Sequence, residues 1–421
     1  MKIGLVTHSA YPDSIGGREH HVHLLAKGIV RQVNAQVIVF TGASRGMKFT
    51  RERTAGGYEL VRVPGLRLTL SKNPCQIYHI APPLSGLLCR EQLDMLHLFE
   101  YGSFMTTAAA LFAIAHHVPF VLTVYGYELQ KPWLRRAKQV FDRSLGAFIL
   151  QRAQKIICVS DAQRAEMLHI GGARVQHSTI VRVNGIETDS PDDFWSCEEL
   201  ETHLPKGSRG SINLLIAARL EQRKGVAVLL QAFRQVLDRI PGEDVRLFLV
   251  GPDHGERDNI ETVVRNLSLQ RRIHIMGAVP PAAMKSLLKA MDIVVVPSLY
   301  EGMPLIILEA MSCGKSVIAS RLSGTSRVIT SGVTGVLVSP GDVAELRDAL
   351  LKLISDRGAR NSMGEAARQE VSRHDVAQEI NFLYEQVYCP ALARPRAGVT
   401  GAKRKKREAG SHVVAQCVQN V

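Results

Sequence analysis

The sequence predicts an α/β protein made of two doubly wound parallel sheets, and three observations carry this prediction. The chain has 421 residues, of which 46% are hydrophobic and 22% charged, which is typical of a globular protein. One hydrophobic core rarely serves more than about 250–300 residues, so two domains are expected. Short apolar β-rich runs alternate with helical patterns along both halves, which indicates parallel sheets covered by helices on both faces.

The first half begins with an apolar strand at Lys2–Thr7 and a helical pattern at Glu19–Arg31. Six further strands are expected at Gln36–Phe40, Leu60–Val63, Met95–Phe99, Phe120–Val124, Lys155–Ser160 and Ser178–Val183. The alternation lapses around Glu187–Gly210, where prolines and glycines cluster. We therefore expect an N-terminal domain over 1–190 and a linker over 191–210.

The second half repeats the alternation, which predicts a C-terminal domain over 211–374. Its strands are expected at Ile212–Ala217, Arg246–Val250, Ile273–Met276, Ile293–Pro297 and Ser316–Ser320, and its helices at Gly225–Asp238, Asp258–Leu267, Pro281–Ala290 and Leu305–Ser312. A final helix, 375–389, is expected to return to the N-terminal domain, and the basic segment 390–421 is expected to be disordered. Ligands of such sheets bind at the carboxyl ends of strands, so the loops that follow strands are the places to search.

Charge is distributed unevenly around a net charge of +13. Residues 1–190 carry 22 basic and 13 acidic side chains, and residues 390–421 carry seven and one, so both regions suit an anionic partner. No aromatic residues interleave the basic tail, so no nucleic-acid partner is expected. The seven cysteines are scattered and the N-terminus does not have a signal-peptide pattern, which predicts a cytoplasmic protein.

Gly16 and Gly17 end the loop after the first strand and precede a helix. Glycines at a helix N-terminus let backbone N–H groups approach a phosphate, although a plain turn is the favoured explanation when these two glycines are taken alone. His20, His21 and His23 follow, but neighbouring positions on a helix point in different directions, so no metal site is expected.

Two further groups of charged residues follow strands in the second half of the chain. Arg219 and Lys224, five residues apart, suit a diphosphate, although solvated basic residues are the simpler alternative. Glu301 lies in a loop and Glu309 lies two turns into the following helix, with free backbone amides between them. A sugar nucleotide would use two carboxylates for hydroxyls and the amides for phosphate, and surface charges are the alternative.

Taken together, these motifs resemble the retaining, nucleotide-sugar-dependent glycosyltransferases of family 4, over about residues 1–387. The matching features are the GG-x-E-x-H loop at Gly16–His21, the VSDA stretch at Val159–Ala162, the VNGI segment at Val183–Ile186, the R-L-x-x-x-K-G run at Arg219–Gly225, the LVGP strand end at Gly251, and the E-x7-E pair Glu301 and Glu309 within PSLYEGMPL to CGKSVIAS. The resemblance implies the GT-B fold, in which two Rossmann-like domains face a cleft. It also implies transfer of a hexose from a nucleoside diphosphate sugar to an acceptor, with retention of configuration and without a metal or another cofactor.

The resemblance implies residue roles as well. Arg219 and Lys224 would hold the diphosphate and stabilise the leaving charge, and Glu301 would bind hydroxyls of the transferred sugar. Donor contacts would come from Gly16, Gly17, Gly251, Gly302, Met303, Pro304, Leu305 and Glu309. Candidate acceptor or sugar contacts are His21, Tyr125 and Glu128.

Two positions depart from the family pattern. Tyr125 stands where a histidine is common, and Arg327 stands where an acid is common. These departures keep open a degenerate sugar-nucleotide-binding protein as one alternative. Another GT-B enzyme, such as a nucleotide-sugar epimerase or a disaccharide synthase or phosphorylase, is the other alternative.

Residues 128–155 read as a basic helix with aromatic residues at helical spacing. Such a helix can lie on an anionic membrane, and a core helix with a solvated face is the alternative. A glycan, a lipid-linked molecule or a small molecule is expected as the acceptor, and the basic helix predicts peripheral contact with the inner face of a membrane.

Overall fold

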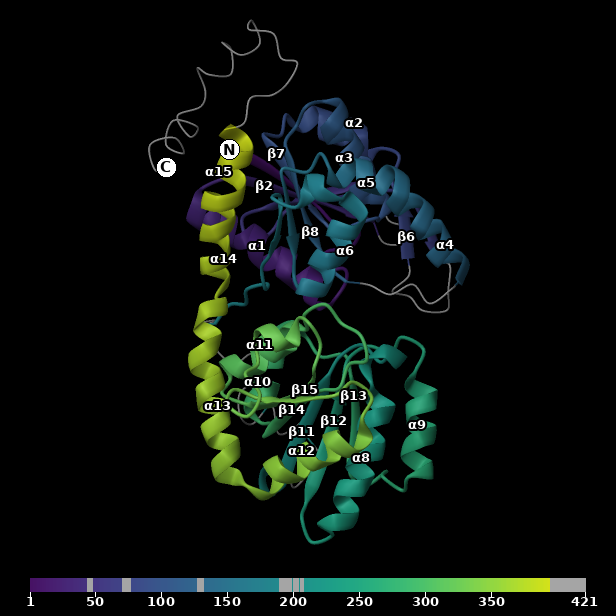
Figure 1. The fold of residues 1–421 in the computed structure, drawn as a ribbon, viewed down its shortest axis with the longest axis vertical. Helices are drawn as coiled ribbons and strands as arrows, with labels where there is room; N and C mark the ends of the chain where they lie inside the picture. Colours follow the sequence, from purple (N-terminus) through teal and green to yellow (C-terminus); the bar gives the residue numbers. More distant parts are fainter. Residues whose placement is uncertain are drawn as a thin grey trace, which may run out of the picture. The chain divides into compact units, whose positions relative to one another are not determined.

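A computed structural model describes residues 1–43, 48–69, 77–126, 132–188 and 208–393, together with positions 199 and 204. These residues form two compact units: the first holds the described residues up to 185 together with 376–393, and the second holds 186–375 (Figure 1). The predicted linker is described only at 199, 204 and 208–210, and the predicted basic tail lies outside the described residues from 394 onward. Across the described ranges, every helix is too short or too polar to cross a lipid bilayer.

The first unit is built on an eight-stranded sheet with the order β10-β9-β8-β7-β1-β2-β4-β3. Its strands are β1 (Lys2–Val6), β2 (Gln36–Gly42), β3 (Thr50–Arg53), β4 (Glu59–Val63), β7 (Met95–Phe99), β8 (Phe120–Val124), β9 (Lys155–Cys158) and β10 (Thr179–Val181). All neighbours pair in parallel except β3 and β4. The sequence analysis missed β3, which reads TRER, because an exposed polar edge strand has no apolar alternation to reveal it. A separate antiparallel pair joins β5 (Leu66–Thr69) to β6 (Ile77–Ile80).

Helices cover both faces of this sheet, because successive strand residues point to opposite sides. Ile3 and Leu5 of β1 share one core with α1 (Gly17–Val33), α14 (Val376–Phe382), the π-helical turn η7 (Leu383–Tyr388) and α15 (Cys389–Ala393). Val6 and Phe40 share the other core with α2 (Leu84–Glu91), α3 (Phe104–Ala115), α5 (Ala147–Leu150) and α6 (Asp161–Gly171). The remaining helical elements are α4 (Pro132–Phe141), the π-helical turn η1 (Asp142–Gly146) and the 3-10 turn η2 (Ala173–Val175).

The C-terminal helical segment packs against α1. It continues to Ala393, past the predicted end before Pro390. The Cys389 N–H donates to the Tyr384 carbonyl oxygen five residues back, and this wider turn accommodates a proline that has no N–H to donate.

The second unit has a six-stranded, all-parallel sheet with the order β13-β12-β11-β14-β15-β16. Its strands are β11 (Ile212–Ala217), β12 (Val245–Val250), β13 (Ile273–Gly277), β14 (Ile293–Val296), β15 (Ser316–Ser320) and β16 (Val336–Val338). Its helices are α8 (Val226–Arg239), α9 (Arg257–Asn266), α10 (Pro281–Lys289), α11 (Leu305–Ser312), α12 (Val343–Ser355) and α13 (Arg357–Val371), and its 3-10 turns are η3 (Ser208–Gly210), η4 (Gln222–Lys224), η5 (Thr325–Arg327) and η6 (Ser372–His374). The two sheets confirm the predicted α/β class with two doubly wound units.

Each sheet has one point at which the strand order reverses. In the first unit this switch lies between β1 and β7, and in the second it lies between β11 and β14. Parallel sheets with helices on both faces form a crevice at the carboxyl ends of the two strands that flank the switch. The loops after these four strands are therefore where the fold can best hold a ligand.

Candidate donor-binding site

Lys224 lies at the switch point of the second sheet, in the turn η4 that connects β11 to α8. Gly225 follows it with a φ of +71°, and a Cβ there would lie 2.0 Å from the Pro297 carbonyl oxygen. Only glycine fits this close approach. The glycine therefore brings the lysine turn against the end of β14, where the loop with Glu301 begins.

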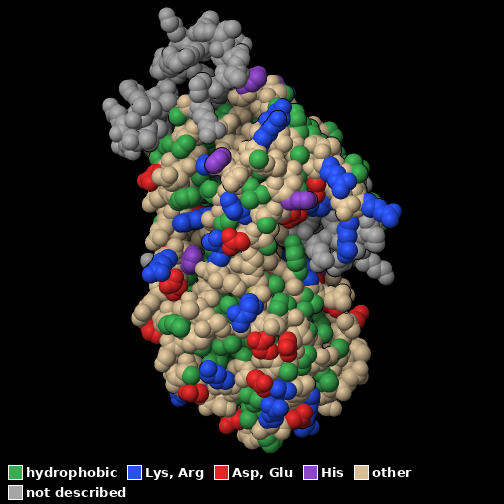
Figure 2. Space-filling view, in the orientation of Figure 1, with side chains coloured by type: hydrophobic (Ala, Val, Ile, Leu, Met, Phe, Trp, Pro, Cys, Tyr) green, Lys and Arg blue, Asp and Glu red, His purple; other side chains and the backbone are tan. Residues whose placement is uncertain are grey.

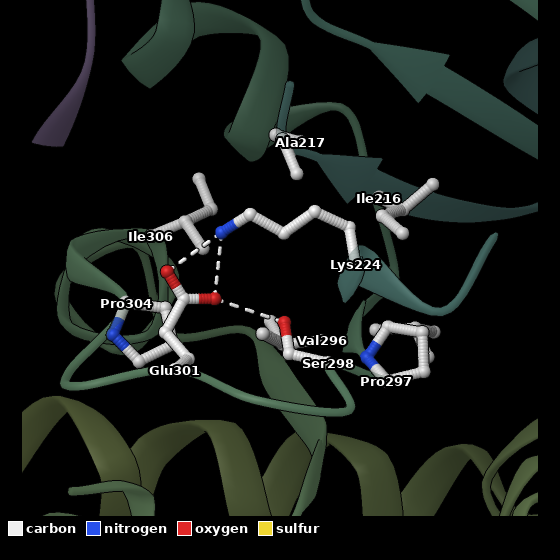
Figure 3. A pocket seen from close by; sticks show the side chains of 11 residues that line it. Ile216, Ala217, Lys224, Val296, Pro297, Ser298, Glu301, Pro304 and Ile306 are labelled. Atoms are coloured by element: carbon white, nitrogen blue, oxygen red, sulfur yellow. Dashed lines mark hydrogen bonds and ion pairs between the residues drawn. The ribbon is translucent and has the colours of Figure 1, made fainter. Parts of the chain in front are cut away.

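Lys224 and Glu301 form a buried ion pair (Figure 3). The lysine Nζ lies 2.6 Å from each carboxylate oxygen, and the Ser298 hydroxyl donates to one of them at 2.9 Å. Only 10% of the lysine side chain and 14% of the glutamate side chain are exposed. Burial lowers the pKa of Lys224, and the Glu301 charge offsets this only in part. Burial is the largest single effect and would raise the pKa of Glu301, but the charges of Lys224 and Arg223 and the hydrogen bonds from Lys224 and Ser298 together lower that pKa.

The pair borders a small cavity of about 10 Å³, which is space for roughly one water molecule. Its lining includes Ala218, Pro297, Pro304 and Ile306 beside the two charged residues. The cavity at the switch point is thus lined by charged side chains on one side and by apolar side chains on the other.

Arg219 and Arg223 add positive charge beside Lys224. Both pair with the buried carboxylate of Glu221, at 3.4 and 2.9 Å respectively. Their charges also contribute to lowering the pKa of Lys224, although less than its burial does. The predicted pair Arg219 and Lys224 therefore belongs to one electrostatic group.

The loop after Glu301 leads into α11. Gly302, Met303 and Pro304 are buried, and Pro304 caps the helix that begins at Leu305. A Cβ on Gly324 would lie 1.8 Å from the Gly302 carbonyl oxygen, so the segment preceding Arg327 packs directly on this loop. The amides of the first turn of α11 face the end of the loop and favour an anion.

Glu309 lies midway along α11 and is half-buried. Burial raises its pKa to about 7, and no described residue donates to or pairs with its carboxylate. Because this half-buried carboxylate has no partner among the described residues, it is available to accept from a ligand hydroxyl.

Gly251 ends β12 with a φ of +143°, and a Cβ there would lie 1.9 Å from the Ala218 carbonyl oxygen. This glycine therefore lets the ends of β11 and β12 approach each other. Its predicted donor contact stays a prediction, as do the donor roles of Gly302, Met303, Pro304 and Leu305.

The predicted residues of the first unit lie in a different arrangement. Gly16 precedes α1, Gly17 is its first residue, and a Cβ on Gly16 would lie 2.5 Å from the Glu19 carboxylate. His21 is 1% exposed, and its two ring nitrogens lie 2.9 Å from the Tyr125 hydroxyl and 2.9 Å from the Glu379 carboxylate. Tyr125 thus belongs to a buried chain of hydrogen bonds.

The Glu379 carboxylate also accepts from the Gly185 amide at 2.5 Å, so this chain reaches the end of the first unit. The acceptor roles of His21 and Tyr125 stay predictions. Glu128 lies outside the described residues.

Sequence reasoning missed Ser298, Glu221 and Arg223. Glu221 and Arg223 lie inside the R-L-x-x-x-K-G run, and Ser298 lies three residues before Glu301. The only feature of the sequence that could have indicated these three residues is their position close to residues already selected.

Two family descriptions match the chain. "Glycosyltransferase Family 4" matches residues 15–190, and "Glycosyl transferases group 1" matches residues 206–370. The first match covers most of the first unit, and the second covers most of the second unit.

Individual proteins are similar over parts or all of the chain. A D-inositol 3-phosphate glycosyltransferase of Corynebacterium jeikeium is 32% identical over 193 residues, which is 44% of this chain and 44% of that protein. This chain therefore aligns with less than half of the length of that relative. An N-acetyl-alpha-D-glucosaminyl L-malate synthase of Bacillus anthracis is 25% identical over 94% of this chain and 99% of that protein.

Among solved structures, Anabaena Alr3699/HepE in complex with UDP-glucose superposes with a TM-score of 0.71 at 22% identity. The superposition covers 92% of this chain and 100% of that one. This likeness concerns the fold, and it agrees with the two parallel sheets described above. The chain belongs to the family 4 glycosyltransferases and has the GT-B fold.

Proposed function

We propose that this protein transfers a hexose from a nucleoside diphosphate sugar to an acceptor hydroxyl, with retention of the anomeric configuration. The Lys224–Glu301 pair at the switch point of the second sheet is the observation that carries the proposal. It joins a cation suited to phosphate with a carboxylate suited to sugar hydroxyls. A relative named as a glycosyltransferase and a fold neighbour solved with UDP-glucose support the same activity.

In this reaction negative charge grows on the departing diphosphate as its bond to the anomeric carbon breaks. Lys224 and Arg219 stabilise that charge, and the amides at the start of α11 add to their effect. Glu301 holds hydroxyls of the transferred sugar, and Ser298 keeps its carboxylate aligned. Glu309 accepts from the ribose hydroxyls.

Retention follows when the acceptor attacks from the face that the diphosphate leaves. The new bond joins the acceptor oxygen to the anomeric carbon, and the hydroxyl proton leaves on the diphosphate. This route needs no covalent carboxylate intermediate, in contrast to retaining glycoside hydrolases. The positive charge comes from the side chains of the protein, so we propose that no metal is required.

The test uses UDP-, GDP- and ADP-glucose with a total small-molecule extract as the source of acceptor. We expect release of nucleoside diphosphate only when acceptor is present, and NMR of the product should show the anomeric configuration of the donor. An inverted product would contradict retention. Interconversion of the donor sugar without transfer would favour an epimerase, and binding without turnover would favour a degenerate binding protein.

We also propose that α4 and α5 contact an anionic bilayer surface. Trp133, Val140 and Phe148 are 52%, 69% and 38% exposed along this segment. Exposed Arg135, Arg136, Arg143 and Arg152 accompany them, and Lys and Arg side chains gather over α4 on the face in Figure 2. Exposed apolar and basic side chains together suit the headgroup region of an anionic membrane.

Flotation with phosphatidylglycerol vesicles at low salt tests this contact. The double variant Arg136→Glu and Arg143→Glu should lose binding. A matched control, Arg265→Glu and Arg357→Glu, makes the same charge change on exposed residues of the second unit and should keep it. Equal flotation of both double variants would remove the proposed membrane contact.

A further inference from the structure

The switch point of the first sheet also holds a group of polar side chains. His8 and Ser9 follow β1, Glu100 follows β7 directly, and Arg18 and Glu19 lie in the first turn of α1. We call these five residues the switch-point cluster. Sequence reasoning assigned no role to the side chains of this cluster.

Short contacts connect all five members. His8 Nδ1 lies 2.6 Å from a Glu100 oxygen, and Ser9 donates to Glu19 at 2.6 Å. The Arg18 guanidinium lies 2.7 Å from Glu19, 3.1 Å from Glu100 and 3.0 Å from His8 Nε2. Its Nε atom is buried and has no partner among the described residues.

The contacts determine the charge of the cluster. His8 Nε2 faces an arginine N–H and therefore accepts, so the single proton of a neutral ring lies on Nδ1 and is donated to Glu100. Burial is the largest single effect and would raise the pKa of both carboxyl groups, but the Arg18 charge and the hydrogen bonds from Ser9 and Arg18 to Glu19 and from His8 to Glu100 oppose it, and both pKa values are lowered to about 2. One guanidinium thus stands against two carboxylates, which leaves a net charge of −1.

The cluster remains reachable from solvent. The side chains of His8, Arg18 and Glu100 are 17%, 18% and 15% exposed. Glu100 has a φ of +96°, a backbone conformation that is unfavourable for a non-glycine residue. The carboxylate is thus held at the end of β7 in spite of an unfavourable backbone conformation.

We propose that the switch-point cluster binds hydroxyl groups of the acceptor and that the part of the acceptor bound there is uncharged. This inference rests on the proposed function and adds the chemical class of its second substrate. Carboxylates accept from hydroxyls, and a hydroxyl can at the same time accept from a guanidinium N–H. The Arg18 guanidinium is already paired with Glu19 and Glu100. A phosphate bound to it would therefore lie close to two carboxylates, and their negative charges would repel it.

The experiment uses the wild-type protein, the variant Glu100→Gln and the labelled donor that the wild type turns over. A total small-molecule extract supplies the acceptor, either untreated or dephosphorylated with alkaline phosphatase. We expect the wild type to form the same labelled product from both extracts. Glu100→Gln should reduce transfer about 100-fold while donor binding and slow donor hydrolysis stay unchanged, because the acceptor hydroxyl is misplaced.

Glu166→Gln is the matched control, since it neutralises a glutamate of the same unit that is paired with Lys138 outside the cluster. Glu100→Asp is the second variant: it keeps the charge, shortens the side chain and tolerates a positive φ, and it should also lower transfer. Its melting temperature shows whether the fold persists.

Three outcomes would overturn a part of the proposal. A product that forms only from the untreated extract would overturn the uncharged acceptor, and full transfer by a folded Glu100→Gln or Glu100→Asp would overturn the site. A wild type that neither binds nor consumes any donor would instead overturn the proposed function, and this inference with it.

Discussion

The two switch points of this protein have the same topology but opposite electrostatic designs. In the second sheet Lys224 meets the Glu301 carboxylate, and Arg219 and Arg223, which share the single carboxylate of Glu221, add positive charge. In the first sheet one arginine meets two carboxylates and a neutral histidine. Positive charge therefore exceeds negative charge beside Lys224, whereas negative charge exceeds positive charge beside Glu100.

This difference shows how one architecture can suit two substrates. A parallel sheet supplies a crevice wherever its strand order reverses, but the side chains that follow the strands decide what binds there. The electropositive switch point suits a diphosphate, and the electronegative one suits hydroxyl groups. Three single substitutions and a chelation experiment test this contrast.

Replacing Lys224 with alanine should lower turnover by about 1,000-fold or more and weaken UDP binding by much less. The lysine charge is needed most when negative charge develops on the leaving diphosphate. Steady-state kinetics and calorimetric titration with UDP measure the two effects. Lys352→Ala, at an exposed position of α12, is the control and should leave both unchanged. Equal losses in turnover and UDP binding would show that Lys224 only holds the nucleotide.

Replacing Arg18 with alanine should destabilise the protein by about 3 kcal/mol near pH 7, because two partly buried carboxylates lose their cation. Urea unfolding at several pH values measures this. The wild type should lose stability as the pH falls from about 5 towards 2, since the pKa values of Glu19 and Glu100 lie near 2 when folded and near 4.5 when unfolded. The variant should lose less over this range. An unchanged pH dependence would contradict the charge assignment of the switch-point cluster.

Replacing Glu309 with glutamine should stabilise the protein by about 2 kcal/mol at pH 8 and have no effect near pH 4. Burial raises the pKa of Glu309 from 4.5 to about 7 in the folded state. The unfolded chain therefore ionises at lower pH than the folded protein, and the stability lost to this residue grows as the pH rises from about 4.5 to about 7. Thermal unfolding at both pH values gives the result. Glu243→Gln, at an exposed glutamate just before β12, should show no such gain. A gain of equal size at both pH values would exclude an ionisation effect.

Treatment with EDTA should leave transfer unchanged, since Lys224 and Arg219 provide the positive charge at the diphosphate. Activity measured before and after chelation, and again after addition of Mg²⁺ or Mn²⁺, is the test. Loss with chelation and recovery with either ion would show that the electropositive switch point needs a metal as well.

Strongly apolar elements were predicted with accurate bounds in both halves of the chain. The expected bounds of β11, α11 and β15 agree with the structure, because strongly apolar runs between glycines and prolines leave little choice of register. Other elements were not predicted, among them β3, β16, α12, α13 and the extension past Pro390. The polar edge strand β3 and the π-helical turn before Pro390 have no periodic signal in the sequence.

The site residues differ in how far apart in the sequence their partners lie. Lys224, Glu301 and Glu309 stand in short motifs whose spacing can be read from the sequence. His8 and Glu100 are 92 positions apart, and His21 and Glu379 are 358 positions apart, so no local pattern links either pair. Arg18 was visible only as the variable position of a glycine-rich loop.

The amino-acid sequence by itself determined the two doubly wound halves, the family and the residues of the electropositive switch point, because apolar periodicity and motif spacing act over short stretches of chain. Only the tertiary structure decided which distant charges meet. Strand order brings β1 beside β7, and this contact turns an isolated histidine, an arginine and a glutamate into one cluster whose net charge depends on their mutual distances.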